Sequence, residues 1–172
     1  MTSNNSSRWF IAYVKSCQER RVAEILEKMG VEYYLPMQRE VHKWSDRRKI
    51  VVRLIIPHIV FVKVTELVRR ELLKSVYGIH SYMMDRATGR PAVVPDHEMK
   101  AFRMMVEHSG APVAMNSEPL VSGDLVRVIS GPLCGMEYEL AEVHGNKCIV
   151  TRIDFLGSAF VEFDESNLEK IG

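Results

Sequence analysis

The stretch Ile50–Val64, IVVRLIIPHIVFVKV, decides how the first part of the chain is organised. It contains two runs rich in β-branched residues that meet at Pro57, a residue with no N–H to give to a sheet. After His58 the residues are apolar at both alternating positions, except for Lys63. A strand that is apolar on both faces lies inside a sheet with packed layers on each side. A short buried helix would give a similar run, but β-branched residues and proline favour a central strand.

The composition is that of a globular protein without a membrane segment. Of 172 residues, 47% are hydrophobic and 26% are charged, as in ordinary soluble proteins. The first residues, MTSNNSS, lack the apolar core of a signal peptide, and no run approaches the roughly 18 apolar residues of a membrane span. Cys17, Cys134 and Cys148 show no CxxC spacing, which favours a reducing compartment. We expect a cytoplasmic protein that does not contact a membrane.

The formal net charge is +1, but charged residues are distributed unevenly along the chain. Residues 1–110 contain 19 lysines and arginines against 12 acidic residues, whereas residues 111–172 contain 4 against 10. This difference indicates two modules with different partners, of which the first would favour a polyanion. Two solvated surfaces of uneven sign would give the same counts, so charge alone does not decide between these interpretations.

The chain begins with a strand followed by a helix. Arg8–Lys15 is an apolar run typical of a strand, and Ser16–Glu19 has the Ser-x-x-Glu form of a capping box. Apolar residues then recur at helical spacing between positions 22 and 29, and Gly30 would end this helix.

A hairpin is expected before the central strand. Val31–Pro36 predicts a short strand, and the hairpin lies between Arg39 and Arg53. Its tip contains the three consecutive cations Arg47, Arg48 and Lys49. They would form either a solvated turn or a contact to phosphates.

Two more helices and a strand complete this part of the chain. Thr65 would cap a helix that ends at Ser75, and Gly78–Met84 predicts a strand. Leu67, Val68, Leu72 and Leu73 would face inward on that helix, with Arg69, Arg70 and Glu71 on its exposed side. A helix from Pro95 and Asp96 to His108 would bury Met99, Phe102, Met105 and Val106. The element order predicts an α+β fold with a ferredoxin-like α/β sandwich.

The last part of the chain predicts a small β-barrel. Residues 109–118 contain small residues, glycine, proline and asparagine without periodicity, which is typical of a linker. The domains would therefore be 1–108, the linker 109–118, and 119–172. Residues 136–143 would also tolerate a helix. Short strands at regular spacing indicate the barrel; they are Leu125–Ile129, Tyr138–Val143, Cys148–Arg152 and Ala159–Phe163.

Three stretches of the first part resemble the amino-terminal domain of the NusG family: Trp9–Lys15, Tyr33–Pro36 and Ile56–Val62. Val121–Val128 and Ser130–Leu133 resemble the carboxy-terminal KOW module of that family. The resemblance covers nearly the whole chain in the right order. The hairpin tip and the lack of a long insertion resemble, more narrowly, the UpxY-type paralogues found with capsular polysaccharide operons.

The resemblance implies a sandwich followed by a five-stranded barrel, and a transcription elongation and antitermination factor without a cofactor. Such a factor bridges the RNA polymerase cleft and disfavours paused and terminating states. The first domain would bind the clamp helices of the polymerase through an apolar patch. That patch would consist of Tyr13, Ile56, Pro57, Ile59 and Phe61. A plain core role is the alternative for these residues, above all for Phe61 and Ile59.

The resemblance also assigns polar contacts. Arg69, Arg70 and Glu71 match a motif that touches the polymerase gate loop, although a solvated helix face is equally consistent. Lys15 and Arg21 match positions that contact non-template DNA. Upstream DNA would be reached by Arg47, Arg48 and Lys49, and an unpaired base would stack on Trp44 or Tyr77; Trp44 could instead pack under the hairpin.

The KOW module would supply a second binding surface. Phe155, Leu156 and Gly157 match the loop that engages a ribosomal protein or a termination factor, and nascent RNA is a further partner. The resemblance expects a glycine where Tyr138 stands.

Two other functions are considered, an enzyme and an RNA- or ribosome-binding protein. No P-loop, GxSxG or HExxH motif is present, so an enzyme is not expected. Cys134, His144 and Cys148 lack a fourth metal ligand, so no metal is expected either. A KOW-type RNA- or ribosome-binding protein would also combine a basic domain with a small barrel, and it is the alternative function.

Overall fold

The structure is a computed structural model that describes residues 5–118, 120 and 123–171. It divides into two compact units, one formed by residues up to Pro36 with Ile56–Asp96, the other by Met37–Ile55 with His97 onward. The domain boundaries 1–108, 109–118 and 119–172 stay a prediction. Val121 and Ser122, part of the stretch that resembles a KOW module, lie outside the described residues. Among the described helices, none is long and apolar enough to cross a membrane.

The first unit is built on an antiparallel sheet with the order β2-β5-β1-β6, in which β9 also pairs with β1. Its strands are β1 (Arg8–Val14), β2 (Glu32–Tyr34), β5 (Ile59–Val64), β6 (Ile79–Tyr82) and β9 (Val93–Val94). The central strand predicted after Pro57 is confirmed, because β5 lies between β2 and β1 and every residue except Lys63 is buried. A short ladder of β7 (Met84–Asp85) and β8 (Arg90–Pro91) follows β6.

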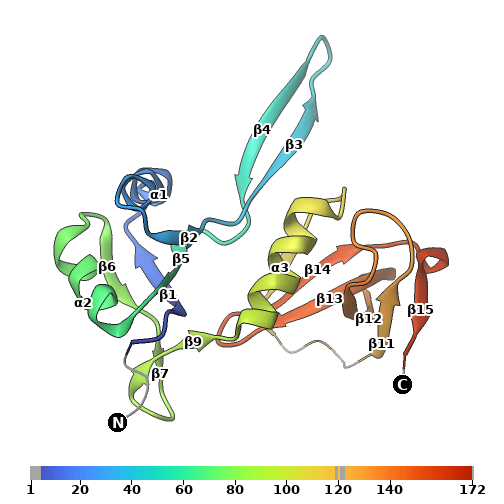
Figure 1. Cartoon of the computed structure of the whole chain (residues 1–172). Coiled ribbons are helices and arrows are strands. Elements are labelled where there is room, and N and C mark those ends of the chain that lie inside the picture. The colour runs from blue at the N-terminus through green and yellow to red at the C-terminus, as the bar shows by residue number, and fades with distance from the viewer. Residues whose placement is uncertain (1–4, 119, 121–122, 172) are drawn as a thin grey trace. The chain divides into compact units, whose positions relative to one another are not determined.

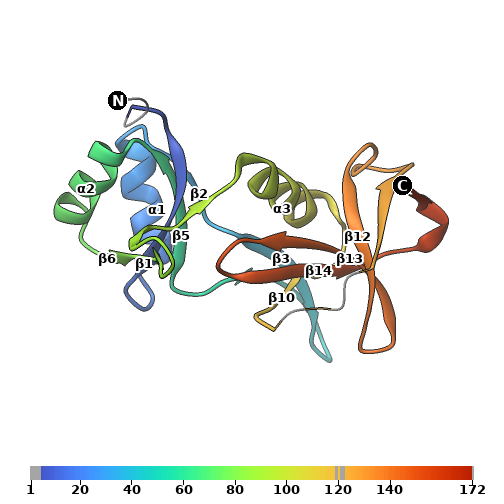
Figure 2. The ribbon, with the colours of Figure 1, turned by 90° about the horizontal axis from the view of Figure 1, so that it is seen from below.

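Two helices, α1 (Glu19–Lys28) and α2 (Glu66–Ser75), lie on one side of this sheet (Figures 1 and 2). The predicted cap of α2 is confirmed, since the Thr65 hydroxyl accepts a hydrogen bond from the Val68 N–H at 3.3 Å. The predicted capping box of α1 is wrong: Gln18 occupies the N-cap and makes no side-chain capping bond. The Glu19 carboxylate is buried and accepts a hydrogen bond from the N–H of His58 instead.

The predicted orientation of α2 is wrong at three positions. Leu67 and Leu73 were expected to face inward but are exposed. Arg69 was expected on the exposed side, yet its side chain is only 11% exposed. Its guanidinium lies 5.6 Å from the ring centre of Phe10 and 5.0 Å from that of Tyr82. A flat guanidinium on an aliphatic stem can cover aromatic rings, and α2 is turned so that Arg69 does this.

The second unit contains the predicted hairpin and the third helix. The hairpin consists of β3 (Met37–Lys43) and β4 (Arg48–Leu54), paired in register from Met37 opposite Leu54 to Lys43 opposite Arg48. The helix is α3 (Asp96–His108), and its predicted apolar stripe is confirmed, because Met99, Phe102, Met105 and Val106 are all buried.

A six-stranded sheet forms the rest of this unit, with the order β10-β14-β13-β12-β11-β15. Its strands are β10 (Ala114–Asn116), β11 (Asp124–Val128), β12 (Glu137–Val143), β13 (Asn146–Ile153), β14 (Gly157–Glu162) and β15 (Leu168–Lys170), with a 3-10 turn at Glu165–Asn167. Residues 136–143, for which a helix was also considered, contain β12 and are not helical in this structure. Among the described residues β10 and β15 are the two ends of the pairing and do not close it. The expected closed barrel of five strands is therefore not found, because part of the predicted linker adds β10 beside β14.

Candidate functional site

The five residues of the expected apolar patch divide into an inner wall and an accessible part. Tyr13 is opposite Ile59 in the β1–β5 register, and Phe61 lies two residues further on the same face. Ile59 is 5% exposed and Phe61 is 0% exposed. Tyr13 and Ile56 are half-buried, and Pro57 is exposed. Of these five residues, a partner can therefore touch only Tyr13, Ile56 and Pro57 in this conformation.

The turn that holds Pro57 is fixed by a buried carboxylate. His58 has a φ of 66°, a left-handed conformation that is uncommon for a residue with a side chain. Its carbonyl oxygen accepts the Val14 N–H at 2.8 Å. Its own N–H donates to Glu19 Oε1 at 3.1 Å, and its Nδ1 lies 3.7 Å from the same oxygen. Glu19 thus ties the turn to α1 and was not identified from the sequence, where the Ser-x-x-Glu pattern assigned it to a cap.

Tyr13 has a second neighbour on the far side of β1. Its ring is stacked on that of His80 in β6, with 6.1 Å between ring centres and 17° between planes. Its orientation is therefore set by β6 as well as by the pairing with β5. The pairing brings Tyr13 and Ile59 together as expected.

The three charged residues of α2 have different surroundings. The Arg69 guanidinium donates to both oxygens of Glu66 and holds the pKa of that carboxyl below its ordinary value. The Arg70 side chain is 69% exposed and lies 3.3 Å from Glu66. Glu71 is exposed. Arg70 and Glu71 are therefore available to a partner, while Arg69 belongs to the packing of α2.

Lys15 and Tyr77 meet on the surface of the first unit. The Lys15 Nζ lies 4.0 Å from the ring centre of Tyr77, and the Lys15 N–H donates to the Gly78 carbonyl at 2.8 Å. Tyr77 is 71% exposed. Arg21, from the first turns of α1, is also exposed. An exposed ring with a cation beside it is suited to a nucleic acid, which offers both bases and phosphates.

The outer half of the hairpin is accessible on both faces, since every residue from 41 to 50 is exposed. Trp44 is 62% exposed, so the alternative that it packs under the hairpin is wrong. Within the part of the chain that the structure describes, Arg47, Arg48 and Lys49 form no ion pair with a carboxylate. Together with Trp44, these three cations lie at or beside the turn that joins β3 to β4.

The base of the hairpin is held by the side chain of Gln38. Its Nε2 donates to the carbonyl oxygens of Val106 and Ala111 at 3.1 and 3.0 Å, and its Oε1 accepts the Val113 N–H at 2.7 Å. Arg53 donates to the Val113 carbonyl at 2.8 Å and to Glu40, which lowers the pKa of that carboxyl. The hairpin is therefore fixed to the end of α3 and to the segment that follows it.

The expected partner loop of the carboxy-terminal part joins β13 to β14. Phe155 is 47% exposed and has a φ of 74°, and Gly157 begins β14; Leu156 between them is half-buried. The N–H of Asp154 donates to Glu98 Oε2 in α3 at 2.8 Å. Burial raises the pKa of Glu98. The loop thus presents one aromatic ring while its start is attached to α3.

Tyr138 stands where the resemblance expects a glycine, and it contacts α3 too. Its hydroxyl donates to the carbonyl oxygen of Ala101 at 3.1 Å. Burial of the ring raises the pKa of this hydroxyl. The phenol therefore supplies a polar link from β12 to α3 that a glycine could not make.

The three side chains considered for a metal are not gathered into a site. Cys134 is exposed and Cys148 is buried in β13. Among the described residues, no group of three histidine, cysteine, aspartate or glutamate side chains could hold a metal ion.

Comparisons with known proteins agree with this architecture. A sequence model of the NusG family, described as transcription termination factor NusG, matches residues 7–103, more than half of the chain. A solved structure of Thermotoga maritima NusG, described as showing domain interaction, is similar with a TM-score of 0.52 and 21% identity over 96% of this chain and 98% of that chain. At this identity the likeness shows the fold. The comparison with curated proteins gave no match. Because the family match spans more than half of the sequence, the chain belongs to the NusG family of transcription factors.

Proposed function

We propose that this protein is a transcription elongation and antitermination factor that binds RNA polymerase across its cleft and suppresses pausing and termination. The observation that carries the proposal is the NusG family match over residues 7–103, which include the whole sheet of the first unit. NusG family factors bind RNA polymerase and are not enzymes. The protein would act with the polymerase in the cytoplasm.

The contact with the clamp helices would be made by Tyr13, Ile56 and Pro57. Their accessible apolar surface is suited to an apolar ridge of a partner helix. Ile59 and Phe61 would support this surface from inside without touching the partner. Glu19 would keep the turn around Pro57 in its binding conformation, so that little conformational entropy is lost on binding.

The opposite side of the cleft would be contacted by α2. Arg70 and Glu71 are exposed and would meet the gate loop, with Arg69 fixing the helix from below. A factor that touches both sides of the cleft binds the closed polymerase more tightly than the open one. Elongation is then favoured by differential binding, without any bond chemistry.

Nucleic acid would be contacted by the two cationic surfaces. Lys15, Arg21 and Tyr77 would face non-template DNA, and the hairpin tip with Trp44 and Arg47–Lys49 would face upstream DNA. Contacts of this kind position the factor without reading sequence, and each cation that neutralises a phosphate steepens the salt dependence.

The strands β11–β15 would act as the KOW module of the family, within the proposed domain 119–172. Its loop with Phe155, Leu156 and Gly157 would engage a ribosomal protein, a termination factor or nascent RNA. The hairpin tip also supports a narrower role of the UpxY type at polysaccharide biosynthesis operons, because residues 44–50 resemble those paralogues.

The test is a Tyr13→Ala variant of the full chain with purified core polymerase. We expect the variant to bind polymerase more weakly and to suppress pausing less, with an unchanged melting temperature. Tyr77→Ala removes a ring of the same kind outside the patch and is the control, since it should leave DNA-free polymerase binding unchanged. Equal losses of binding and of melting temperature for Tyr13→Ala would mean that Tyr13 is a core residue. Run-through assays on capsule-operon leaders against unrelated templates test the narrower role.

A further inference from the structure

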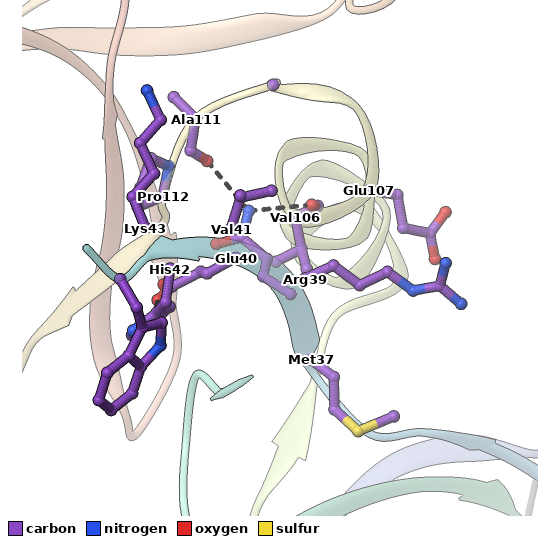
Figure 3. Close-up of a pocket in the computed structure, with 13 residues that line it drawn as sticks. Met37, Arg39, Glu40, Val41, His42, Lys43, Val106, Glu107, Ala111 and Pro112 are labelled. Carbon is purple, nitrogen blue, oxygen red and sulfur yellow. Dashed lines mark hydrogen bonds and ion pairs between the residues drawn. The ribbon is translucent and has the colours of Figure 1, made fainter. Parts of the chain in front are cut away.

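A hollow of about 890 Å³ runs along the outer edge of β3 (Figure 3). All β3 residues line it, with Trp44 at one end and the end of α3 and Gly110–Pro112 on the other side. No residue of β4 lines it. A hollow over a face of the ribbon would touch both strands, so this one lies beside the ribbon, next to the strand edge.

The edge of β3 that faces the hollow has free backbone groups. Among the described residues β3 pairs only with β4. The Trp44 N–H donates to the Arg47 carbonyl at 2.8 Å, which makes them a hydrogen-bonded pair. Such pairs alternate along an antiparallel ladder, so the N–H and C=O groups of Arg39, Val41 and Lys43 point away from β4. An edge of this kind can pair with an added strand.

The side chains along this edge specify what would pair with it. Arg39, Val41 and Lys43 share one face of the ribbon, and in the described residues neither cation forms an ion pair with a carboxylate. The two acidic residues that line the hollow are already engaged: Glu40 with Arg53, and Glu107 with Arg103. A strand added here would meet a cation, an aliphatic side chain and a second cation at alternate positions.

We propose that the outer edge of β3 binds an extended segment of another protein with the pattern acidic-x-aliphatic-x-acidic. The segment would add a third strand to the hairpin, with its carboxylates opposite Arg39 and Lys43 and its aliphatic side chain opposite Val41. This chain contains no such pattern in its 172 residues, so a second copy is not the occupant. A nucleic acid could neutralise the cations, but its backbone has no N–H to pair with the exposed carbonyls. The proposal does not depend on polymerase binding.

The probe is a fluorescein-labelled synthetic peptide with the core ETVTE, titrated with the full chain and followed by fluorescence anisotropy. We expect saturable binding, with at least about tenfold loss of affinity in the double variant Arg39→Glu, Lys43→Glu. The same variant should gain affinity for a peptide with the core KTVTK, which shows that it is folded. The double variant Arg47→Glu, Lys49→Glu is the matched control, because it makes the same change of four charges on the same hairpin. Lys49 is opposite His42 and Arg47 is opposite Trp44, so both lie on the other face from Arg39 and Lys43, and affinity should stay within about threefold.

Amide hydrogen exchange gives an independent readout. The N–H groups of Arg39, Val41 and Lys43 should exchange fast in the free protein and slow when the ETVTE peptide is bound. Absence of saturable binding at millimolar concentration, or an equal loss of affinity in the Arg47→Glu, Lys49→Glu control, would overturn the proposal. Equal slowing of these amides by a duplex or single-stranded oligonucleotide would overturn the choice of a peptide as occupant.

Discussion

Replacing Gln38 by leucine should loosen the hairpin from the rest of the second unit. The side chain makes three hydrogen bonds to backbone groups of Val106, Ala111 and Val113. Val113 is fully buried, so leucine would leave its N–H without a partner. A hydrogen bond contributes about 0.5–1.5 kcal/mol net, and a buried orphan group costs about 1–3 kcal/mol. Because the site is partly open to water and leucine adds apolar contact, we expect the free energy of unfolding to fall by about 2–3 kcal/mol.

The assay is urea unfolding of the full chain at neutral pH. For a chain of 172 residues, a loss of this size corresponds to a fall in melting temperature of about 4–12 °C. Val41→Ala, an exposed change on the same strand, should stay within about 0.5 kcal/mol and is the control. A loss below about 0.5 kcal/mol for Gln38→Leu, with unchanged exchange of the Val113 amide, would refute the argument that Gln38 anchors the hairpin.

Other changes test other parts of the structure. Glu19→Ala should lower the free energy of unfolding by about 1.5–3 kcal/mol and weaken polymerase binding. Glu19→Gln can still accept the His58 N–H, so it should retain most of the stability and most of the affinity. Urea unfolding measures the stability and a binding titration measures the affinity. Glu66→Gln should lower stability at neutral pH and flatten its pH dependence in acid-unfolding curves. The reason is that Arg69 lowers the folded pKa of Glu66, so its contribution is present above the ordinary value of 4.5 and is lost as pH falls through the folded pKa. Gly157→Ala should displace β10, because a Cβ would lie 2.2 Å from a carbonyl oxygen in that strand; faster exchange of the β10 amides would show it, and unchanged exchange would contradict it.

Some features of the candidate site could be found from sequence and others could not. The hairpin with its cationic tip was predicted, because charge and β-branched alternation are visible within a few residues. The five patch residues stay a prediction. A core role was the alternative above all for Ile59 and Phe61, and both are buried, but the sequence did not show that Pro57 would be exposed. Exposure depends on what distant segments cover, and a strand apolar on both faces gives no sign of which face stays open.

The sequence by itself determined the three helices and the longer strands in their order, because backbone preference and apolar periodicity act over neighbouring residues. It did not show the short strands, among them β10 in the predicted linker and β15. Only the tertiary structure decided that Glu19 would bond to His58, 39 residues away, and that Gln38 would bond to Val113, 75 residues away. It also decided that Arg69, and not the leucines of α2, would cover the rings beneath that helix. A polar side chain takes whichever partner lies nearby once both are removed from water, and that neighbourhood exists only after the chain has folded.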